Sequence, residues 1–213
     1  MNLLYRLHKD KLESLGYDTI YLEKPIADIC KNINWQYILE PPPSNLSKKT
    51  LRELQLLSKL TKNRTDKEVQ LVYNIDKDMD TPFELLCKSY GVEYPKAHVD
   101  QFYTLIRPIL LNTKGFYNRP RPNQLAPYFN IQINIIETDT HHTAAYPSGH
   151  TVYSKLASLI LKNQYGQIDQ TKLDNIVNTV TEARMLQGVH YPSDCEASLV
   201  FASTLFRQLK GFF

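Results

Sequence analysis

Three clusters of polar residues in the second half of the chain carry residue types that can do chemistry. The first, "KGFYNRPRP", brings Lys114, Arg119 and Arg121 into a proline-rich turn. Prolines fix the backbone, so cationic side chains can converge on a multiply charged anion at low entropic cost. Taken alone, basic residues in such a loop are equally typical of a solvated surface.

The second cluster, "YPSGHT", places Ser148 where it would cap a helix, with Gly149 and His150 in the first turn. A helix N-terminus presents free N–H groups and the positive end of the helix dipole, and glycine lets a ligand approach the backbone closely. A phosphate group would fit there. A plain serine-capped helix is the alternative interpretation.

The third cluster is "ARMLQGVHYPSD". Gly188 is typical of a helix end and Pro192 of a helix start, so His190 is expected in the connection between two helices. Asp194, in the first turn of the second helix, can reach one ring nitrogen of His190 and leave the other as a nucleophile. A histidine in such a turn is often structural, but the three clusters together suit phosphoryl transfer through a phosphohistidine.

The elements that must position these clusters are expected to be helices. The chain has only 7 glycines in 213 residues, and apolar residues recur at helical spacing in segments such as "LSKKTLRELQLLSKL". This pattern predicts an all-α protein, a single helical bundle over residues 1–213. The helices are expected near residues 4–15, 25–38, 46–60, 66–76, 81–90, 96–113, 149–164, 168–187 and 192–210.

Two connecting segments interrupt this pattern. "EPPPSN" cannot be helical because successive prolines remove backbone donors, and Ser44 or Asn45 would cap the helix that follows. Residues 115–147 are expected to form a long loop, in which the alternation "NIQINIIETDT" would suit a short pair of strands. A loop of this length in a compact domain is usually functional.

Composition narrows the class of protein further. A net charge of +3, evenly spread, argues against nucleic acid as a partner, and no apolar run reaches the roughly 18 residues that span a bilayer. We therefore expect a soluble, cytoplasmic protein without a signal peptide, although a processed periplasmic form would have a similar sequence. Cys30, Cys87 and Cys195 are too far apart for a zinc site, and free thiols are favoured over one disulfide. The oligomeric state is not indicated.

The spacing within the three clusters resembles that of a known family. Lys114 is followed, after six intervening residues, by Arg121-Pro122, then by Pro147-Ser-Gly-His150, and then by Arg184, His190 and Asp194. This order resembles the type 2 phosphatidic acid phosphatase (PAP2) superfamily, which includes class A bacterial acid phosphatases, membrane lipid phosphatases and vanadium-dependent haloperoxidases. Arg119 and the "YPSGHT" context look most like the soluble acid phosphatases.

The resemblance implies a phosphatase core from about residue 80 to 213, preceded by an N-terminal helical layer, about residues 1–80, without an assigned role. It also implies a set of groups that bind phosphate: Lys114, Arg121, Arg184, Ser148 and Gly149, with Arg119 as a further candidate.

The resemblance further implies that His190 attacks phosphorus, that Asp194 holds its imidazole and that His150 protonates the leaving alcohol. No metal and no other cofactor is implied, although phosphate or vanadate could occupy the anion site. The expected partner is a small phosphorylated substrate. Peripheral contact with a lipid headgroup stays open.

One residue departs from the family pattern, because the third motif normally begins Ser-Arg and here begins Ala183-Arg184. The missing hydroxyl removes one hydrogen bond to the anion, worth about 1.5–3 kcal/mol. The expected function is a soluble, metal-independent phosphatase that hydrolyses phosphomonoesters. The alternatives are a vanadium-dependent haloperoxidase and a module that binds phosphate or a lipid headgroup without turnover.

Overall fold

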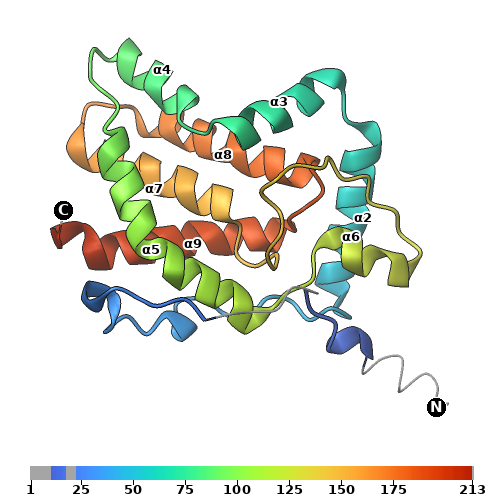
Figure 1. Cartoon of the computed structure of the whole chain (residues 1–213). Helices are drawn as coiled ribbons and strands as arrows, with labels where there is room; N and C mark the ends of the chain where they lie inside the picture. The colour runs from blue at the N-terminus through green and yellow to red at the C-terminus, as the bar shows by residue number, and fades with distance from the viewer. Residues whose placement is uncertain (1–10, 18–22, 213) are drawn as a thin grey trace.

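The computed structural model describes residues 11–17 and 23–212, and every regular element in these ranges is helical (Figure 1). The predicted all-α class is confirmed. The α-helices are α2 (Lys48–Asn63), α3 (Asp66–Lys77), α4 (Thr81–Ser89), α5 (Lys96–Tyr117), α6 (Pro122–Leu125), α7 (Gly149–Gln164), α8 (Gln170–Leu186) and α9 (Pro192–Leu209). The short 3₁₀ helices are η1 (Asp28–Cys30), η2 (Trp35–Tyr37), η3 (Ala126–Phe129) and η4 (Lys210–Phe212).

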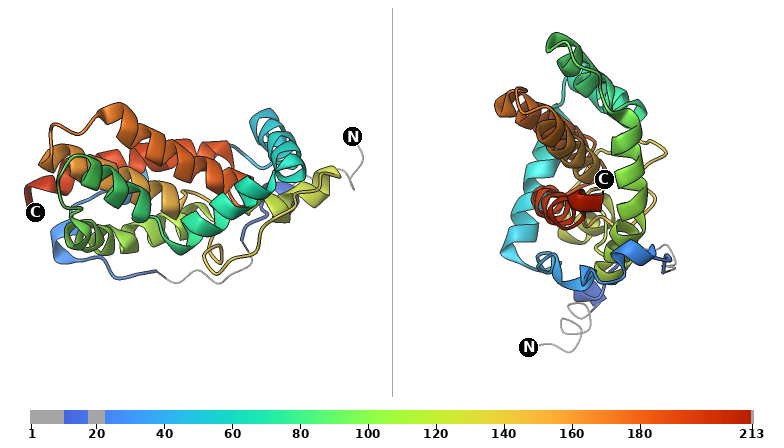
Figure 2. Two further views of the ribbon diagram at one scale, coloured as in Figure 1. Left: turned by 90° about the horizontal axis from the view of Figure 1, so that it is seen from above. Right: turned by 90° about the vertical axis from the view of Figure 1, so that its left-hand side faces the viewer.

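Helix α7 lies at the centre of the bundle, where it packs against α8, α9 and α5. Its apolar residues Val152, Leu156 and Ile160 repeat every four positions and are buried, because this spacing places them on one face of the helix. Burying each such side chain contributes about 1.5–3 kcal/mol. In the end-on view, α2 and α5 lie to either side of α9 (Figure 2, right).

The N-terminal layer consists of α2 and α3, which both contact α8. Helix α2 begins two residues later than expected, because Ser47 is its cap and accepts a hydrogen bond from the Thr50 N–H at 3.1 Å. The predicted caps, Ser44 and Asn45, are therefore wrong. The Asn45 side-chain amide instead donates to the carbonyls of Leu12 and Leu15, each at 2.9 Å, and so ties the preceding segment to the start of α2.

The helix predicted for residues 25–38 is also wrong, since only the single turns η1 and η2 form there. Asn32 and Asn34 favour other conformations because their side chains compete for backbone hydrogen bonds. The segment lies against the main core through partly buried apolar side chains, among them Ile33 and Trp35. The helix predicted for residues 4–15 lies largely outside the described residues.

The predicted strand pair within residues 130–140 does not form. This segment has no regular secondary structure, and its backbone makes hydrogen bonds to neighbouring elements instead of to itself. Ile136 N–H donates to the Gln187 carbonyl at 3.0 Å, and the Gln187 side chain donates back to the Ile136 carbonyl at 3.0 Å. The predicted loop 115–147 is also shorter than expected, because α5 continues to Tyr117 and α6 and η3 lie within it.

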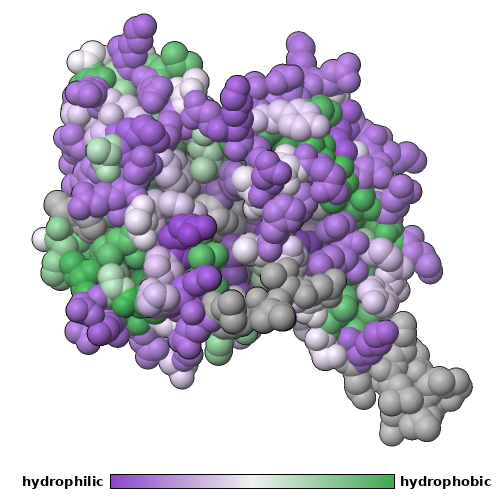
Figure 3. Space-filling model, in the orientation of Figure 1, coloured by the Kyte–Doolittle hydropathy of each residue, from purple (hydrophilic) through white to green (hydrophobic). Residues whose placement is uncertain are grey.

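Cys30, Cys87 and Cys195 are free and buried, as the sequence predicts. None of the described helices is long and apolar enough to cross a membrane. The face shown in Figure 3 is mainly hydrophilic, with apolar residues gathered in separate patches.

Candidate active site

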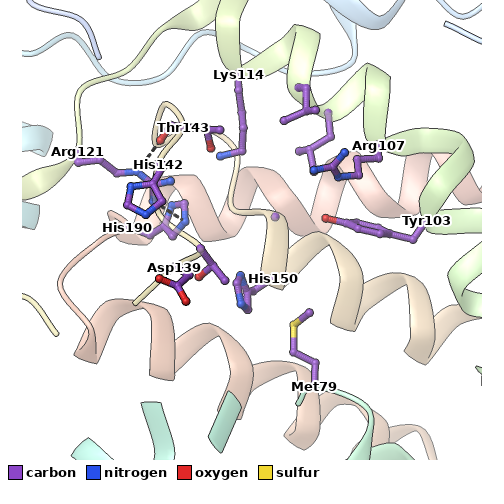
Figure 4. A pocket seen from close by; sticks show the side chains of 14 residues that line it. Met79, Tyr103, Arg107, Lys114, Arg121, Asp139, His142, Thr143, His150 and His190 are labelled. Atoms are coloured by element: carbon purple, nitrogen blue, oxygen red, sulfur yellow. Dashed lines mark hydrogen bonds between the residues drawn. The ribbon is translucent and has the colours of Figure 1, made fainter. Parts of the chain in front are cut away.

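A cavity of about 380 Å³ opens between α5, the start of α7 and the connection from α8 to α9 (Figure 4). Five residues singled out in the sequence line it, although they come from different parts of the chain: Lys114, Arg121, Gly149, His150 and His190. Cavities of roughly 300–1,000 Å³ are typical of sites for whole small-molecule ligands.

His190 lies in the connection between α8 and α9, where the sequence places it. Gly188 takes a φ of 84° just after α8, a left-handed conformation that suits glycine, and Pro192 begins α9. Asp194, in the first turn of α9, has one carboxylate oxygen 3.3 Å from His190 Nδ1 and accepts from the Tyr191 N–H at 2.9 Å. The predicted contact between the two side chains is present, and both are buried.

The other ring nitrogen of His190 faces Arg121. Its Nε2 lies 2.9 Å from Arg121 Nη1, which also donates to the Val189 carbonyl at 2.8 Å. A guanidinium can only donate, so Nε2 must accept and the proton must be on Nδ1, toward Asp194. The Nε2 lone pair is therefore directed toward the cationic side of the cavity.

Burial, reinforced by the charges of Arg121 and Lys114, lowers the pKa of His190 well below its ordinary value. The ring is neutral at physiological pH as a result. A neutral imidazole with a fixed tautomer is the form that can act as a nucleophile.

Two cations border the same space and are held by backbone carbonyls. Lys114 Nζ donates to the Ala144 carbonyl at 2.7 Å, and Arg121 Nε donates to the Thr143 carbonyl at 2.8 Å. Burial and the neighbouring Arg121 lower the pKa of Lys114, and burial and Arg184 lower the pKa of Arg121 to about 10. An oxyanion in the cavity would relieve this mutual repulsion.

Arg184 is buried behind the cavity wall. Its Nη1 donates to an Asp76 carboxylate oxygen at 2.8 Å and its Nη2 to Thr140 Oγ1 at 3.3 Å. Its Nε has no hydrogen-bond partner among the described residues. Ala183, the departure from the family pattern, packs in an apolar cluster with Val72 and Ile75 between α3 and α8, and it does not line the cavity.

The N-terminus of α7 forms another wall. Ser148 is the predicted cap, and its hydroxyl accepts from the Thr151 N–H at 3.5 Å, but its side chain is fully buried. Gly149 lines the cavity, and a Cβ at this position would lie 3.6 Å from the Tyr103 hydroxyl, an ordinary contact. Packing within the protein does not require glycine at this position. The lack of a side chain at Gly149 instead leaves room for a ligand in the cavity.

His150 lines the cavity from the first turn of α7, with Nε2 3.6 Å from an Asp76 carboxylate oxygen. Burial and the charge of Arg184 lower the pKa of His150 to about 3, while Asp76 opposes this shift. The ring is therefore neutral in the free cavity. A bound dianion would favour its protonated form.

Sequence reasoning missed Asp76, which lies on α3 in the N-terminal layer. Burial opposes its ionisation, but hydrogen bonds from Thr140 and Arg184 lower the pKa of the carboxyl. The only sequence signal is that Asp76 follows the buried Val72 by four positions, which puts a carboxylate beside the apolar face of an amphipathic helix.

Arg119, the further candidate for phosphate binding, does not line this cavity. Its Nη1 lies 2.5 Å from Asp194 and its Nη2 lies 3.2 Å from Glu53, while the guanidinium stacks over the Tyr191 ring at 3.8 Å. Its contacts thus place it behind Asp194. Glu53, on α2, is a second residue that sequence reasoning missed, and it also accepts from the Ser193 N–H at 2.9 Å.

Comparisons with known proteins identify the family and the fold. The PAP2 superfamily matches residues 99–209, more than half of the chain, so the chain belongs to the PAP2 superfamily. The match covers most of α5 and continues through α9, and it leaves α2, α3 and α4 outside it. No curated protein matches the sequence significantly.

Two solved structures are similar in fold. A bacterial vanadium-dependent iodoperoxidase has a TM-score of 0.63 and 14% sequence identity, and the similarity covers 94% of this chain and 60% of that chain. A transmembrane PAP2-type phosphatidylglycerolphosphate phosphatase from Bacillus subtilis has a TM-score of 0.53 and 16% sequence identity. This similarity covers 78% of this chain and 87% of that chain. At these identities the comparison shows the fold shared by PAP2 phosphatases and haloperoxidases.

Within the described residues, no group of three or more His, Cys, Asp or Glu side chains is arranged to hold a metal ion. The donor set of the cavity is cationic and imidazole-based instead. Such a set suits a tetrahedral oxyanion, and phosphate and vanadate both have this shape.

Proposed function

We propose that this protein is a phosphatase that hydrolyses small phosphomonoesters through a phosphohistidine, without a metal ion. The observation that carries the proposal is the orientation of His190, whose neutral ring directs the Nε2 lone pair into a cavity bordered by Lys114 and Arg121. Lys114, Arg121 and the N-terminus of α7 can neutralise the charge on the phosphoryl oxygens, which is the main catalytic task in phosphoryl transfer.

In the first step, His190 Nε2 attacks phosphorus and the bond from phosphorus to the ester oxygen breaks. The ester oxygen takes a proton from His150 and leaves as an alcohol. The Asp194 carboxylate stabilises the Nδ1–H of the phosphorylated ring. For this step the substrate phosphate must displace the contact between Arg121 and His190 Nε2.

In the second step, water attacks the phosphohistidine and loses a proton to His150. The bond from phosphorus to Nε2 breaks, and its electron pair returns to the ring. Inorganic phosphate then leaves, and both histidines are restored to their starting states. One histidine must be protonated and the other neutral at the outset, so a bell-shaped dependence of the rate on pH, with an acidic to neutral optimum, belongs to the proposal.

A cytoplasmic location is part of the proposal and is supported by the three free thiols, since a reducing compartment keeps cysteines unpaired. The acid phosphatases remain the expected subgroup. Catalytic competence is supported against a binding-only module because both histidines line the cavity and Asp194 contacts one of them.

Hydrolysis of p-nitrophenyl phosphate in the presence of a chelator tests the proposal. The parent protein should turn over, and His190→Ala should lose at least about a thousandfold in kcat, since removal of a nucleophile leaves only binding and electrostatic effects. His98→Ala, on α5 but outside the cavity, serves as the control. Mass spectrometry of acid-labile phosphate on the quenched protein should locate it at His190, and hydrolysis by His190→Ala at the parent rate would contradict the proposal.

The fold similarity to the iodoperoxidase favours one alternative, a vanadium-dependent haloperoxidase. The same cations would hold vanadate, with His190 Nε2 as its protein ligand, and the bound group would supply activation of peroxide. Oxidation of iodide in the presence of vanadate and peroxide distinguishes the two, because vanadate should only inhibit a phosphatase.

A further inference from the structure

The cavity continues beyond the groups that would hold the reacting phosphate, along one face of α5. Tyr103, Arg107, Leu110, Leu111 and Lys114 follow one another at intervals of one to four residues and all line the cavity. This spacing places them in one stripe along the helix. Figure 4 shows Arg107 and Tyr103 directed toward the cavity, and Arg107, which is exposed, lies on its open side. The part near Arg107 has no task in the proposed reaction.

Arg107 differs from the other cations of the cavity because it has no partner. Within the described part of the chain it makes no hydrogen bond or ion pair, whereas Lys114 and Arg121 are held by carbonyls. It lies seven residues before Lys114, which corresponds to about 10 Å along the helix axis. The two charges therefore face the same cavity at separate places.

The wall between these two charges is apolar. Leu110 and Leu111 lie on α5 between them, and Met79 lines the cavity from the connection between α3 and α4. The Tyr103 hydroxyl makes no hydrogen bond with any described residue and faces the same space. The Tyr103 hydroxyl therefore offers a neutral hydrogen-bond donor next to the Arg107 guanidinium.

Asp139 makes the arrangement asymmetric. It lines the cavity beside His142, on the side away from Arg107 and Tyr103 (Figure 4). A second negative group on the substrate would be repelled by Asp139 and attracted by Arg107. A substrate with one phosphate and a neutral remainder would leave Arg107 without an anion.

On the basis of the phosphatase function proposed above, we infer that Arg107 and Tyr103 form a second anion subsite. The substrate class is then a small molecule that carries two anionic groups. One is the phosphate that His190 attacks, and the other is a phosphate or carboxylate on the order of 10 Å away, at the distance set by the helix. A short apolar or ring-shaped spacer lies against Leu110, Leu111 and Met79.

The first experiment measures the spacing. The probes are the bisphosphates of ethanediol, butanediol, hexanediol and octanediol, each paired with the monophosphate of the same diol, and the readout is kcat/KM from released phosphate. The preference for the bisphosphate should be largest at an intermediate length, by about tenfold, and should lie mainly in KM because the distant group binds without reacting. A matched carboxyalkyl phosphate shows whether the second group is recognised as phosphate or as carboxylate.

The second experiment removes the subsite charge. Arg107→Gln should reduce kcat/KM for the best bisphosphate about tenfold more than for its monophosphate, and Arg107→Lys should retain part of the preference because it keeps the charge. Arg207→Gln, an exposed arginine on α9 outside the cavity, is the matched control and should leave the preference unchanged.

The outcomes separate the two proposals. If p-nitrophenyl phosphate is hydrolysed but bisphosphates are not preferred, or if Arg107→Gln affects both esters equally, the subsite inference is wrong and the phosphatase function stands. A preference for long-chain alkyl phosphates would also overturn it. If nothing is hydrolysed, the affinity of the bisphosphates is measured by calorimetry instead. Bisphosphates that bind more tightly than inorganic phosphate, with the difference lost in Arg107→Gln, support the subsite alone. Bisphosphates that bind no more tightly than inorganic phosphate overturn it.

Discussion

At the scale of single residues, two histidines that look alike in the sequence have different tasks because their neighbours differ. Burial and nearby cations lower the pKa of both, to about 3 for His150. Only His190 has a carboxylate on its Nδ1 and a guanidinium on its Nε2. His190 is therefore ready to attack, whereas His150 becomes an acid only when the substrate brings negative charge next to it.

Asp76 supports the acid form of His150, so Asp76→Asn should impair the first step. Loss of the carboxylate charge lowers the pKa of His150 further, and the alkaline limb of the kcat profile should move to lower pH. The loss of kcat at neutral pH should be about tenfold to a hundredfold, because the variant weakens general acid catalysis by His150 without removing it. The measurement is kcat against pH for the parent and the variant.

Thr140→Val provides the control for this prediction, because it removes one hydrogen bond to Asp76 and leaves the charge in place. Its alkaline limb should stay near that of the parent. A uniform loss of kcat in Asp76→Asn, without movement of the limb, would show that Asp76 only holds Arg184 in position.

The residues that sequence reasoning found and missed differ in where they lie. Lys114, Arg121, His150 and His190 belong to motifs whose internal spacing alone carries the signal. Asp76 lies on a helix of the N-terminal layer, and its role arises only because α3 packs across α8. Contacts between helices that are far apart in the sequence are set by tertiary packing, which a single sequence does not display.

At the scale of elements, helix positions followed from apolar periodicity, and the failures came where other contacts replaced it. Residues 25–38 have apolar side chains that reach the core from an irregular segment, and the alternating residues near Ile136 pair with Gln187. Helix α2 shows what the N-terminal layer contributes. Its Glu53 accepts from Arg119 and from Ser193, directly behind Asp194.

Glu53→Gln should weaken both stability and catalysis. The variant leaves the buried Arg119 with Asp194 as its only ion-pair partner among the described residues. Because one partner remains, the loss of stability should be smaller than the about 3–5 kcal/mol that an unpaired buried charge costs. Asp194 would then hold His190 less well, so kcat should fall about tenfold while KM stays nearly constant. Urea unfolding and steady-state kinetics, the latter well below the unfolding transition, measure the two effects.

Gln55→Ala is the matched control, because Gln55 is exposed on the same helix. Its unfolding free energy should stay within about 0.5 kcal/mol of the parent value. A Glu53→Gln variant that is destabilised but keeps the parent kcat would restrict α2 to a purely structural role.

At the scale of the whole molecule, the cavity gathers positive charge at a cost in stability that depends on pH. His150 and His190 are buried and neutral in the folded chain, whereas in the unfolded chain they titrate near pH 6.5. Below that pH the unfolded state binds more protons than the folded state. The contribution of the two rings to the free energy of unfolding is therefore fully present above about pH 6.5. It is lost as the pH falls below this value, down to the folded-state pKa, which is about 3 for His150.

The free energy of unfolding should consequently fall by about 1.4 kcal/mol per pH unit for each histidine between about pH 6 and pH 5, above the midpoints near pH 4 at which unperturbed carboxyl groups titrate. His150→Gln and His190→Gln should each show a shallower slope in urea unfolding. Saturating inorganic phosphate should also flatten the slope of the parent, since a bound anion favours the protonated form of His150 and stabilises the folded state. A free energy of unfolding that stays constant over this range, with or without phosphate, would mean that the two rings take up protons in the folded protein. The neutral His190 on which the proposed reaction depends would then be lost at acidic pH.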